Sequence, residues 1–427
     1  MVLLSLLLLM FVIVVGVPIP FAFIVSSLFI VVTGGYDPSF LLPHGYSKIN
    51  SVVVLAIPLF VMAGSIINRG GIGDKLVFSV EKIFGKVKGS LGVVTIIASA
   101  IFGGISGSAS ATTSCIGSIV SPKLKEQGYS AGYIGALISN SGLLGMLIPP
   151  SSIIILYAWL ANVSVLEAFL STVVPGIILL ILFSALNLII VKNDPKILLK
   201  SDLHETRQRH GKKKWGAGPA LLMPVIVLGS IYGGFLTPTE AAAVSVAYAI
   251  IIGMFIYKKL DIQETKAALV YSSMLTGAIM IMLFAVMIIS RLYILEDLPG
   301  QLLAIFLSIS ENPYVIMLII NLFIIIIGMI MDDISAILMI TPILLPIVKQ
   351  IGVDPIHFCS IITVNLGIAN ISPPTAPVLY LGGKIAGAEL KDMLKPTLIF
   401  IILAWVPTLL MVIFLPQLAL YLPNKLM

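Results

Sequence analysis

Long apolar stretches, separated by short polar turns, follow one another along nearly the whole chain. Several hold the roughly 20 apolar residues that a helix needs to cross a bilayer. They lie at about 2–16, 18–33, 50–68, 92–121, 131–161 and 165–191 in the first half, and at about 217–236, 239–257, 267–293, 315–348, 356–383 and 397–421 in the second. Because a segment in lipid must satisfy its own backbone hydrogen bonds, this pattern predicts an all-α polytopic membrane protein.

The composition agrees with this class. The 427-residue chain is 59% hydrophobic and 10% charged, which is more apolar than a water-soluble domain could be. Its formal charge of +6 comes from basic residues in loops, where it sets orientation in the membrane and does not indicate nucleic-acid binding. Cys115 and Cys359 both lie in apolar stretches and predict neither a disulfide framework nor a metal site.

The two halves of the chain repeat one another at a fixed offset of 224 residues. The matching positions are Leu59-Phe60 and Leu283-Phe284, Gly104 and Gly328, Pro122 and Pro346, Gly128 and Gly352, and Pro149-Pro150 and Pro373-Pro374. We therefore expect a first repeat over 1–200, a linker over 192–215 and a second repeat over 216–427. A duplicated apolar unit that Gly and Pro interrupt at matching points is typical of secondary transporters.

The basic residues predict how the chain is threaded through the membrane. Segment 192–215 carries eight Lys and Arg residues, so the positive-inside rule makes it cytoplasmic. The basic groups within 75–88, 123–125 and 258–259 share that side only if 92–121 is a re-entrant hairpin that enters and leaves at one face.

A second hairpin, 315–348, then enters from the opposite face, and both termini lie outside. The two repeats are therefore predicted to be inverted. Inverted repeats with paired hairpins form an alternating-access architecture, whose site lies between the repeats near the midplane.

The tip of the first hairpin is rich in small and hydroxylated residues, among them Ser106 and Ser108. Glycines permit a tight turn there, and freed carbonyls and hydroxyls are the hard oxygen donors that small cations need. The alternative is a small-residue face for close helix packing. The matching interruption at Gly328 favours a functional tip.

The tip of the second hairpin carries two adjacent carboxylates, Asp332 and Asp333. A carboxylate at membrane depth costs about 2.5–3.5 kcal/mol without a partner, so a cation is expected beside it. Asp332 is favoured because it stands 224 residues after Ser108. Its alternative role is to cap the second helix of the hairpin, and the two roles are compatible.

Each hairpin is followed by a helix that a proline pair should break, over 131–161 and 356–383. The break exposes carbonyls on one side and a half-helix N-terminus on the other. The N-termini near Ser151, Ser152 and Thr375 suit an anionic group of a substrate, and the carbonyls suit Na⁺. Arg291, late in its apolar stretch, is either an anion ligand or a side chain that extends to the membrane surface.

The stretches GGISGSASATTSCIG, LLGMLIPPS, GGFLTPTEAAA and GMIMDD, followed by TP, resemble the large membrane subunit of tripartite ATP-independent periplasmic (TRAP) transporters. The resemblance covers essentially the whole chain. It implies a Na⁺-driven importer of small organic acids, such as C4-dicarboxylates or sialic acids, that works by an elevator motion of the hairpin domain. It further implies one Na⁺ site at Ser106, Ser108, Asn140 and Gly145, and a mirrored one at Gly328, Asp332, Ala369 and Pro373.

The same resemblance implies two protein partners, a small four-helix membrane subunit and a soluble periplasmic protein that delivers the substrate. Substrate contacts are expected from Ser108, Ser151, Ser152, Arg291, Asp332 and Thr375. The location it implies is the bacterial inner membrane, with both termini in the periplasm and 192–215 in the cytoplasm.

Two other functions fit parts of the sequence. A stand-alone Na⁺/dicarboxylate symporter would need no binding protein. An intramembrane protease would use Ser106, in the sequence Gly104-Ile-Ser-Gly107, with a histidine as base. Only His357 begins a helix, and it is expected on the outer side, away from Ser106 on the inner hairpin, so no enzyme is predicted.

Overall fold

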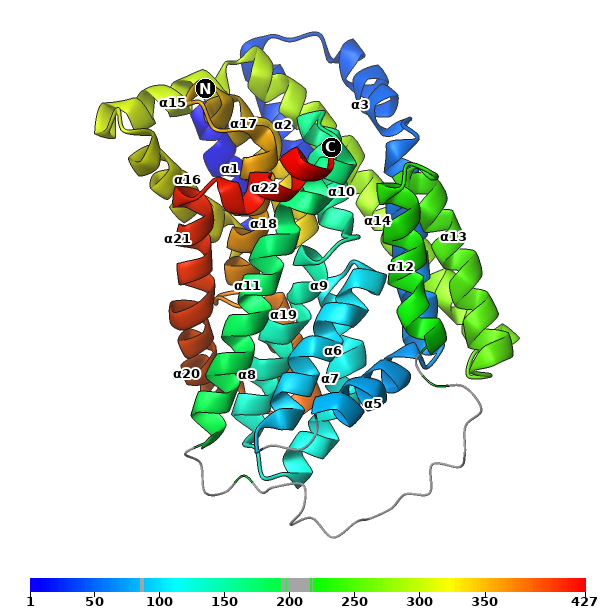
Figure 1. Ribbon diagram of the computed structural model, residues 1–427. Helices are drawn as coiled ribbons and strands as arrows, with labels where there is room; N and C mark the ends of the chain where they lie inside the picture. Colours follow the sequence, from blue (N-terminus) through cyan, green and yellow to red (C-terminus); the bar gives the residue numbers. More distant parts are fainter. Residues whose placement is uncertain (85–87, 193–196, 198–215, 217) are drawn as a thin grey trace.

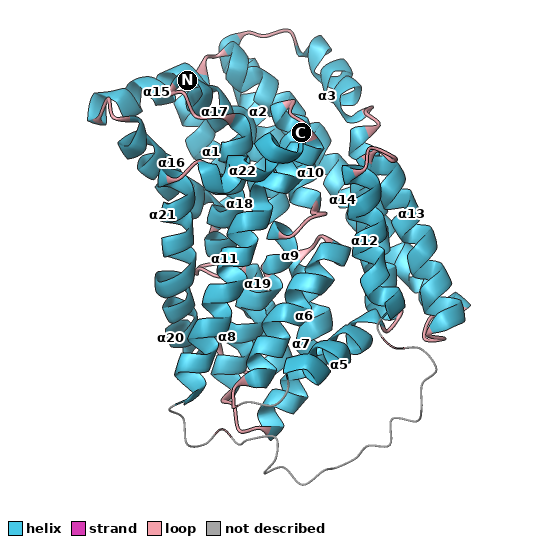
Figure 2. Cartoon of the chain, in the orientation of Figure 1, coloured by secondary structure: helices cyan, strands magenta, loops and turns pink. Residues whose placement is uncertain are grey.

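The computed structural model describes residues 1–84, 88–192, 197, 216 and 218–427, and within these ranges every regular element is a helix (Figure 2). The predicted all-helical class is therefore confirmed. The predicted linker 192–215 lies outside the described residues except for Lys192 and Ile197.

Every predicted apolar stretch contains one or more helices. They are α1 (Val2–Val14), α2 (Ile19–Gly34), α4 (Ala56–Arg69), α6 (Ser90–Ser106), α7 (Ala109–Glu126), α8 (Ala131–Gly142), α9 (Leu144–Leu147), α10 (Ser152–Ala161), α11 (Val165–Lys192), α12 (Gly218–Tyr232), α13 (Pro238–Ile251), α14 (Ile262–Leu295), α16 (Pro313–Gly328), α17 (Asp333–Gln350), α18 (Pro355–Asn370), α19 (Pro377–Ala386), α20 (Leu390–Phe400) and α21 (Val406–Phe414). Five helices of the described chain are long and apolar enough to cross a membrane, or seven if each of two bent pairs counts as one span.

Four further, short helices lie wholly or partly outside the predicted stretches. They are α3 (Leu41–Ile49), α5 (Ile72–Phe84), α15 (Leu298–Ile309) and α22 (Gln417–Leu426). The last predicted stretch, 397–421, also ends earlier than expected: α21 stops at Phe414, just before Pro416, and α22 begins anew at Gln417.

The helix bounds keep the 224-residue offset of the sequence. Helix α7 spans 109–126 and α17 spans 333–350, while α8 begins at 131 and α18 at 355. Both proline pairs contain a cis peptide bond. The duplicated sequence therefore folds into two units of matching elements.

The two hairpins open at opposite ends of the molecule. At the open end of α6 and α7 lie the basic segments: Lys123 pairs with Glu81 at 2.9 Å, and Lys75 stands 5.7 Å from the ring centre of Tyr257. The open end of α16 and α17 lies at the other end, with both chain termini (Figure 1). The inversion of the two repeats stays a prediction, with which this arrangement is compatible.

Contacts divide the helices into two groups. In one, α4 packs against α13 and α14, and α14 also packs against α2 and α3. In the other, the hairpins pack against α8, α10, α11, α18 and α19. Helices α4 and α14 also touch hairpin helices α6 and α17, so each hairpin has one helix at the interface between the groups.

Candidate functional site

The first hairpin turns at Gly107, whose φ of 64° is the left-handed conformation that glycine adopts without strain. Ser108 follows in extended conformation and caps α7, accepting a hydrogen bond from the Ala111 N–H at 3.3 Å. The Gly107 carbonyl in turn accepts from the Ser152 N–H at 3.3 Å. The tip is thus joined directly to the start of α10.

Three of the four residues predicted for the first Na⁺ site meet around Thr112. The Thr112 hydroxyl donates to the Ser108 carbonyl at 2.8 Å, and its Oγ1 lies 3.1 Å from Ser106 Oγ. A Cβ added to Gly145 would stand 2.5 Å from Thr112 Oγ1 and 2.9 Å from the Ser108 carbonyl oxygen. A side chain at position 145 would collide with these two oxygen atoms, so glycine lets them lie against the backbone here.

Thr112 was not among the predicted site residues, although it lies one helical turn after Ser108. Its position four residues beyond the cap was the available signal, because residues i and i+4 share a helix face. The alternative of close small-residue packing is also realised: a Cβ on Gly103 would overlap the Cα of Gly145.

Asn140 makes its hydrogen bonds to other residues than those of this cluster. Its Nδ2 donates to the Ala136 carbonyl at 2.8 Å, and its Oδ1 accepts from the indole N–H of Trp405 at 2.9 Å. Both Asn140 and Trp405 are fully buried. Oδ1 has a second lone pair, so Asn140 can still offer an oxygen, but its main partner is a residue that the sequence analysis missed.

The second hairpin tip places Asp332 at the N-cap of α17. Its carboxylate accepts a hydrogen bond from the Ser335 hydroxyl, and no backbone N–H reaches it. Asp333 Oδ1 accepts from the Ile334 N–H at 3.0 Å, and both carboxylates are half-buried. Asp332 therefore stands at the capping position without making the usual capping bond.

The other residues predicted for the second site come from the facing broken helix. A Cβ on Gly328 would stand 2.6 Å from the Ala369 Cβ. The Thr375 hydroxyl donates to the Met329 carbonyl at 2.6 Å, which joins the turn after Pro373 to this tip. The same pairing of hairpin tip and broken helix thus occurs in both repeats.

Ser151 is the buried polar group without a partner at the first broken helix. It is the N-cap residue of α10, its side chain makes no capping bond, and its hydroxyl has no hydrogen-bond partner among the described residues. A buried, unsatisfied hydroxyl costs about 1–3 kcal/mol. Together with the half-helix N-terminus behind it, Ser151 offers a donor for a ligand oxygen.

Arg291 lies apart from both tips. It lines an open cleft of about 550 Å³ with Phe40, His44, Lys48 and Leu295, between α3 and the end of α14. Met282 on α14, whose sulfur lies 2.9 Å from Ser335 Oγ, is nine residues earlier, so Arg291 stands about 13 Å further along the helix axis. The structure does not bring Arg291 to the other predicted substrate residues.

The predicted site groups are oxygen donors: hydroxyls and carbonyls at the first tip, and a carboxylate at the second. Such donors fit a hard cation such as Na⁺. Ser106 and His357 form no catalytic pair, since His357 Nε2 bonds to the Val412 carbonyl at 2.7 Å and Ser106 contacts Thr112.

Comparison with known proteins identifies the family. Residues 6–418 match the model of the DctM component of tripartite ATP-independent periplasmic transporters. The chain belongs to this family. Because its members are transporter subunits, it is not an enzyme, and with its apolar helices it is a multi-pass inner-membrane protein.

Several relatives have named substrates. The chain is 33% identical over 390 residues to an isethionate TRAP transporter permease of Oleidesulfovibrio alaskensis, covering 90% of this chain but only 60% of that protein. It is 30% identical to the sialic acid TRAP large permease of Vibrio cholerae, covering 96% and 95% of the two chains. To the C4-dicarboxylate TRAP large permease of Pseudomonas aeruginosa it is 31% identical, over 87% and 86%.

A crystal structure of the YdaH transporter of Alcanivorax borkumensis, which has an unusual topology, aligns with a TM-score of 0.63 at 12% identity. The alignment covers 92% of this chain and 89% of that one. At this identity the likeness shows the fold alone.

Proposed function

We propose that this DctM-family protein is the large membrane subunit of a Na⁺-coupled importer of a small organic acid anion. In this proposal the anion arrives on a periplasmic binding protein, and a small four-helix subunit completes the membrane part. The basic end of the molecule faces the cytoplasm, and both termini face the periplasm.

The observation that carries the proposal is the matched pairing of each hairpin tip with its broken helix. At the first, the Ser108 carbonyl oxygen and Thr112 Oγ1 lie against Gly145, and Ser106 Oγ lies 3.1 Å from Thr112 Oγ1. At the second, Asp332 supplies a formal charge. A carboxylate in a membrane segment needs a compensating cation, and Na⁺ is the ion whose ligands these groups match.

The substrate class follows from the broken helices and the relatives together. The N-termini of α10 and α19 carry a partial positive charge, and the Ser151 hydroxyl beside one of them is buried without a partner. Isethionate, sialic acid and C4-dicarboxylates, named for the relatives, are all small organic anions. An anion of this kind between the two tips would accept the Ser151 hydrogen bond.

The division into two helix groups supports a moving part and a fixed part. Helices α4 and α14 each face a hairpin: a Cβ on Gly64 would stand 3.1 Å from the Ser106 carbonyl oxygen, and Met282 contacts Ser335. In the proposed elevator motion, the hairpins and broken helices slide along α4 and α14 and carry the cations and the anion with them.

Uptake into proteoliposomes tests the proposal. The chain is reconstituted with the small subunit, and a panel of labelled organic acids is offered with the binding protein. We expect uptake under an inward Na⁺ gradient, and we expect Asp332→Ala to reduce it to the level of empty vesicles. Asp333→Ala is the matched control, because it removes the same charge one residue away, and it should retain most of the uptake.

Uptake driven equally well by K⁺ would contradict the Na⁺ coupling. Efficient uptake without the binding protein would instead favour the stand-alone symporter, which the family match disfavours. Thermal unfolding of both variants separates lost transport from lost folding.

A further inference from the structure

Trp405 joins the two broken helices. Its indole N–H donates to Asn140 Oδ1 on α8 at 2.9 Å. The other edge of the same ring lies over Gly367 on α18, so closely that a Cβ on Gly367 would overlap the ring atoms Cη2 and Cζ3. The Trp405 side chain therefore contacts both helices close to the predicted cation sites. Its partner on α8 lies five residues before Gly145, and its partner on α18 lies two residues before Ala369.

The local backbone aims this side chain. Trp405 ends a π-helical turn, Ile401–Trp405, that separates α20 from α21. Pro407 follows two residues later. In a regular α-helix its ring would clash with the Leu403 carbonyl, and the wider turn avoids this clash. Such a turn rotates the following residues relative to a regular helix and often occurs at functional sites.

The ring is also fixed from its third side. Phe183 on α11 meets Trp405 edge to face, with ring centres 5.6 Å apart, and it meets Phe400 at 5.5 Å. All three rings are fully buried. The indole therefore cannot move without moving Asn140, Gly367 or Phe183.

The contact has no mirror in the duplicated half. The residue 224 positions before Trp405 is Ile181, which is exposed, and the residue 224 positions after Asn140 is Val364. A valine cannot accept the hydrogen bond. The connection is therefore not a remnant of the duplication: it exists once and joins the repeats asymmetrically.

From this geometry we propose that Trp405 is a positioning residue that couples the two cation sites. The indole N–H can only donate a hydrogen bond. It therefore holds the Asn140 side chain with the amide oxygen, and not the amide nitrogen, toward Trp405. A displacement of α18 when the second site fills is passed through Gly367 and the ring to Asn140 at the first site. The proposal rests on the proposed Na⁺ function and adds the element that makes the two sites act together.

Tryptophan fluorescence tests the coupling directly. The chain has three tryptophans, so replacing Trp159 and Trp215 by Phe leaves Trp405 as its single tryptophan, and the same assembly with Trp405→Phe gives the signal of the partner proteins. Addition of Na⁺ should change its emission in a saturable way, while choline should not. If uptake depends on Na⁺ but the emission of Trp405 does not change when Na⁺ is added, the proposal is overturned.

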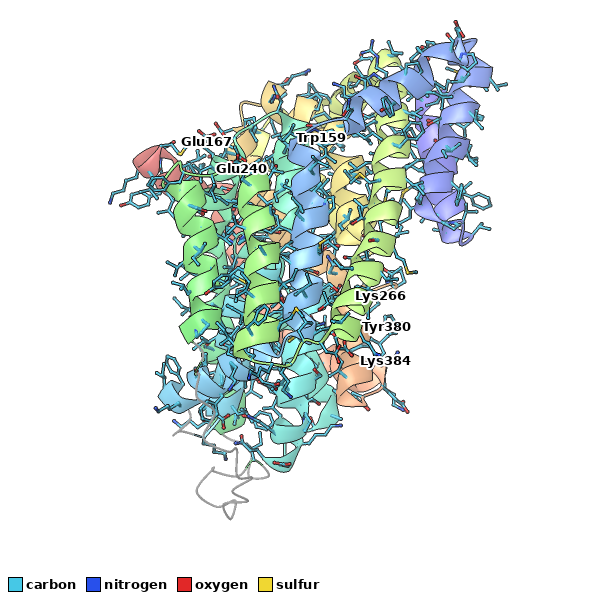
Figure 3. The ribbon with its side chains drawn as sticks, turned by 90° about the vertical axis from the view of Figure 1, so that its right-hand side faces the viewer. Trp159, Glu167, Glu240, Lys266, Tyr380 and Lys384 are labelled. Carbon is cyan, nitrogen blue, oxygen red and sulfur yellow. The ribbon has the colours of Figure 1, made fainter. Side chains whose placement is uncertain are left out.

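The variant Trp405→Phe keeps the ring and removes the N–H. We expect the Na⁺ concentration for half-maximal uptake to rise about three- to tenfold, the range for one neutral hydrogen bond, and the Hill coefficient to fall toward one. Trp159→Phe, at the outer end of α10 (Figure 3), is the matched control and should change neither quantity.

The outcomes distinguish failure of the coupling from failure of the proposed Na⁺-driven transport. A Trp405→Phe protein that melts lower but keeps both Na⁺ parameters shows a purely structural role and overturns the coupling alone. Uptake that is independent of Na⁺ in the unsubstituted chain overturns the proposed function and the coupling together.

Discussion

The two broken helices have equivalent positions in the repeat but different exposure. Pro149, Pro150, Ser151 and Ser152 are all buried, whereas Pro373, Pro374 and Thr375 are exposed. The first turn is sealed by its own hairpin, since a Cβ on Gly107 would stand 2.7 Å from the Pro150 carbonyl oxygen. The second turn contacts its hairpin mainly through the hydroxyl and N–H of Thr375.

This difference indicates which half of the site is accessible in this conformation. An inverted pair that works by alternating access opens one side at a time, so one sealed and one exposed turn are what a single state should show. Exposed side chains continue along α19 at Tyr380 and Lys384, on the side of the molecule that also carries Lys266 (Figure 3). The exposed turn is therefore expected to open toward the basic end.

The largest expected contrast is in chemical accessibility. A cysteine at Thr375 should react readily with a membrane-impermeant maleimide, and a cysteine at Ser151 should not, because the first position is exposed and the second is fully buried. Labelling from each side of sealed vesicles is the measurement. The native Cys115 and Cys359 are buried and serve as the internal background.

Equal labelling of the two positions would show that the two turns do not differ in exposure when the protein is in the membrane. Labelling of Thr375→Cys only from the side opposite the basic loops would reverse the assigned direction of opening.

A second contrast concerns packing at the tips. Gly103→Ala places a methyl group against the backbone of Gly145, and such overpacking costs about 1–3 kcal/mol. Gly277→Ala in α14 adds the same methyl group where nothing lies within 4 Å, so it should be neutral or stabilising by up to about 1 kcal/mol. Thermal unfolding in detergent compares the two, and equal melting temperatures would contradict tight closure of the first tip.

The smallest contrast lies at the caps of the equivalent helices α8 and α18. Asp354 Oδ1 accepts from the Ile356 N–H at 2.6 Å and from the His357 N–H at 3.3 Å, while Ser130 Oγ accepts once, from Tyr133 at 3.3 Å. Replacing a cap by Ala costs about 0.5–2 kcal/mol, and we expect Asp354→Ala near the upper limit and Ser130→Ala near the lower. A larger loss from Ser130→Ala in thermal unfolding would refute this ranking.

Local chemistry made much of the architecture predictable. The sequence Thr237-Pro-Thr-Glu240 has the spacing of a capping box, and Glu240 completes that box with Thr237 at the start of α13. Gly107 turns the first hairpin, and the proline pairs end α9 and α18 before a new helix begins. These features depend on a few neighbouring residues, so a single sequence contains them. The short helices α3 and α15 escaped prediction, because the signal used was an apolar stretch of about 20 residues.

The site was less predictable because it depends on which distant residues meet. Ser106, Ser108 and Gly145 come together as expected, yet Asn140 is held by Trp405, 265 positions later. Arg291 had two equally reasonable roles in the sequence, and only the fold places it in the cleft beside His44 and Lys48.

By itself, the sequence determined the membrane class, the duplication and the points where helices break, because hydropathy, glycine freedom and proline geometry act locally along the chain. The tertiary structure alone decided which oxygen atoms face one another, that one broken helix is sealed while its counterpart is exposed, and that a single tryptophan joins the repeats. These properties arise from packing between segments far apart in the chain, where small differences between duplicated residues, such as Asn140 and Val364, lead to different contacts.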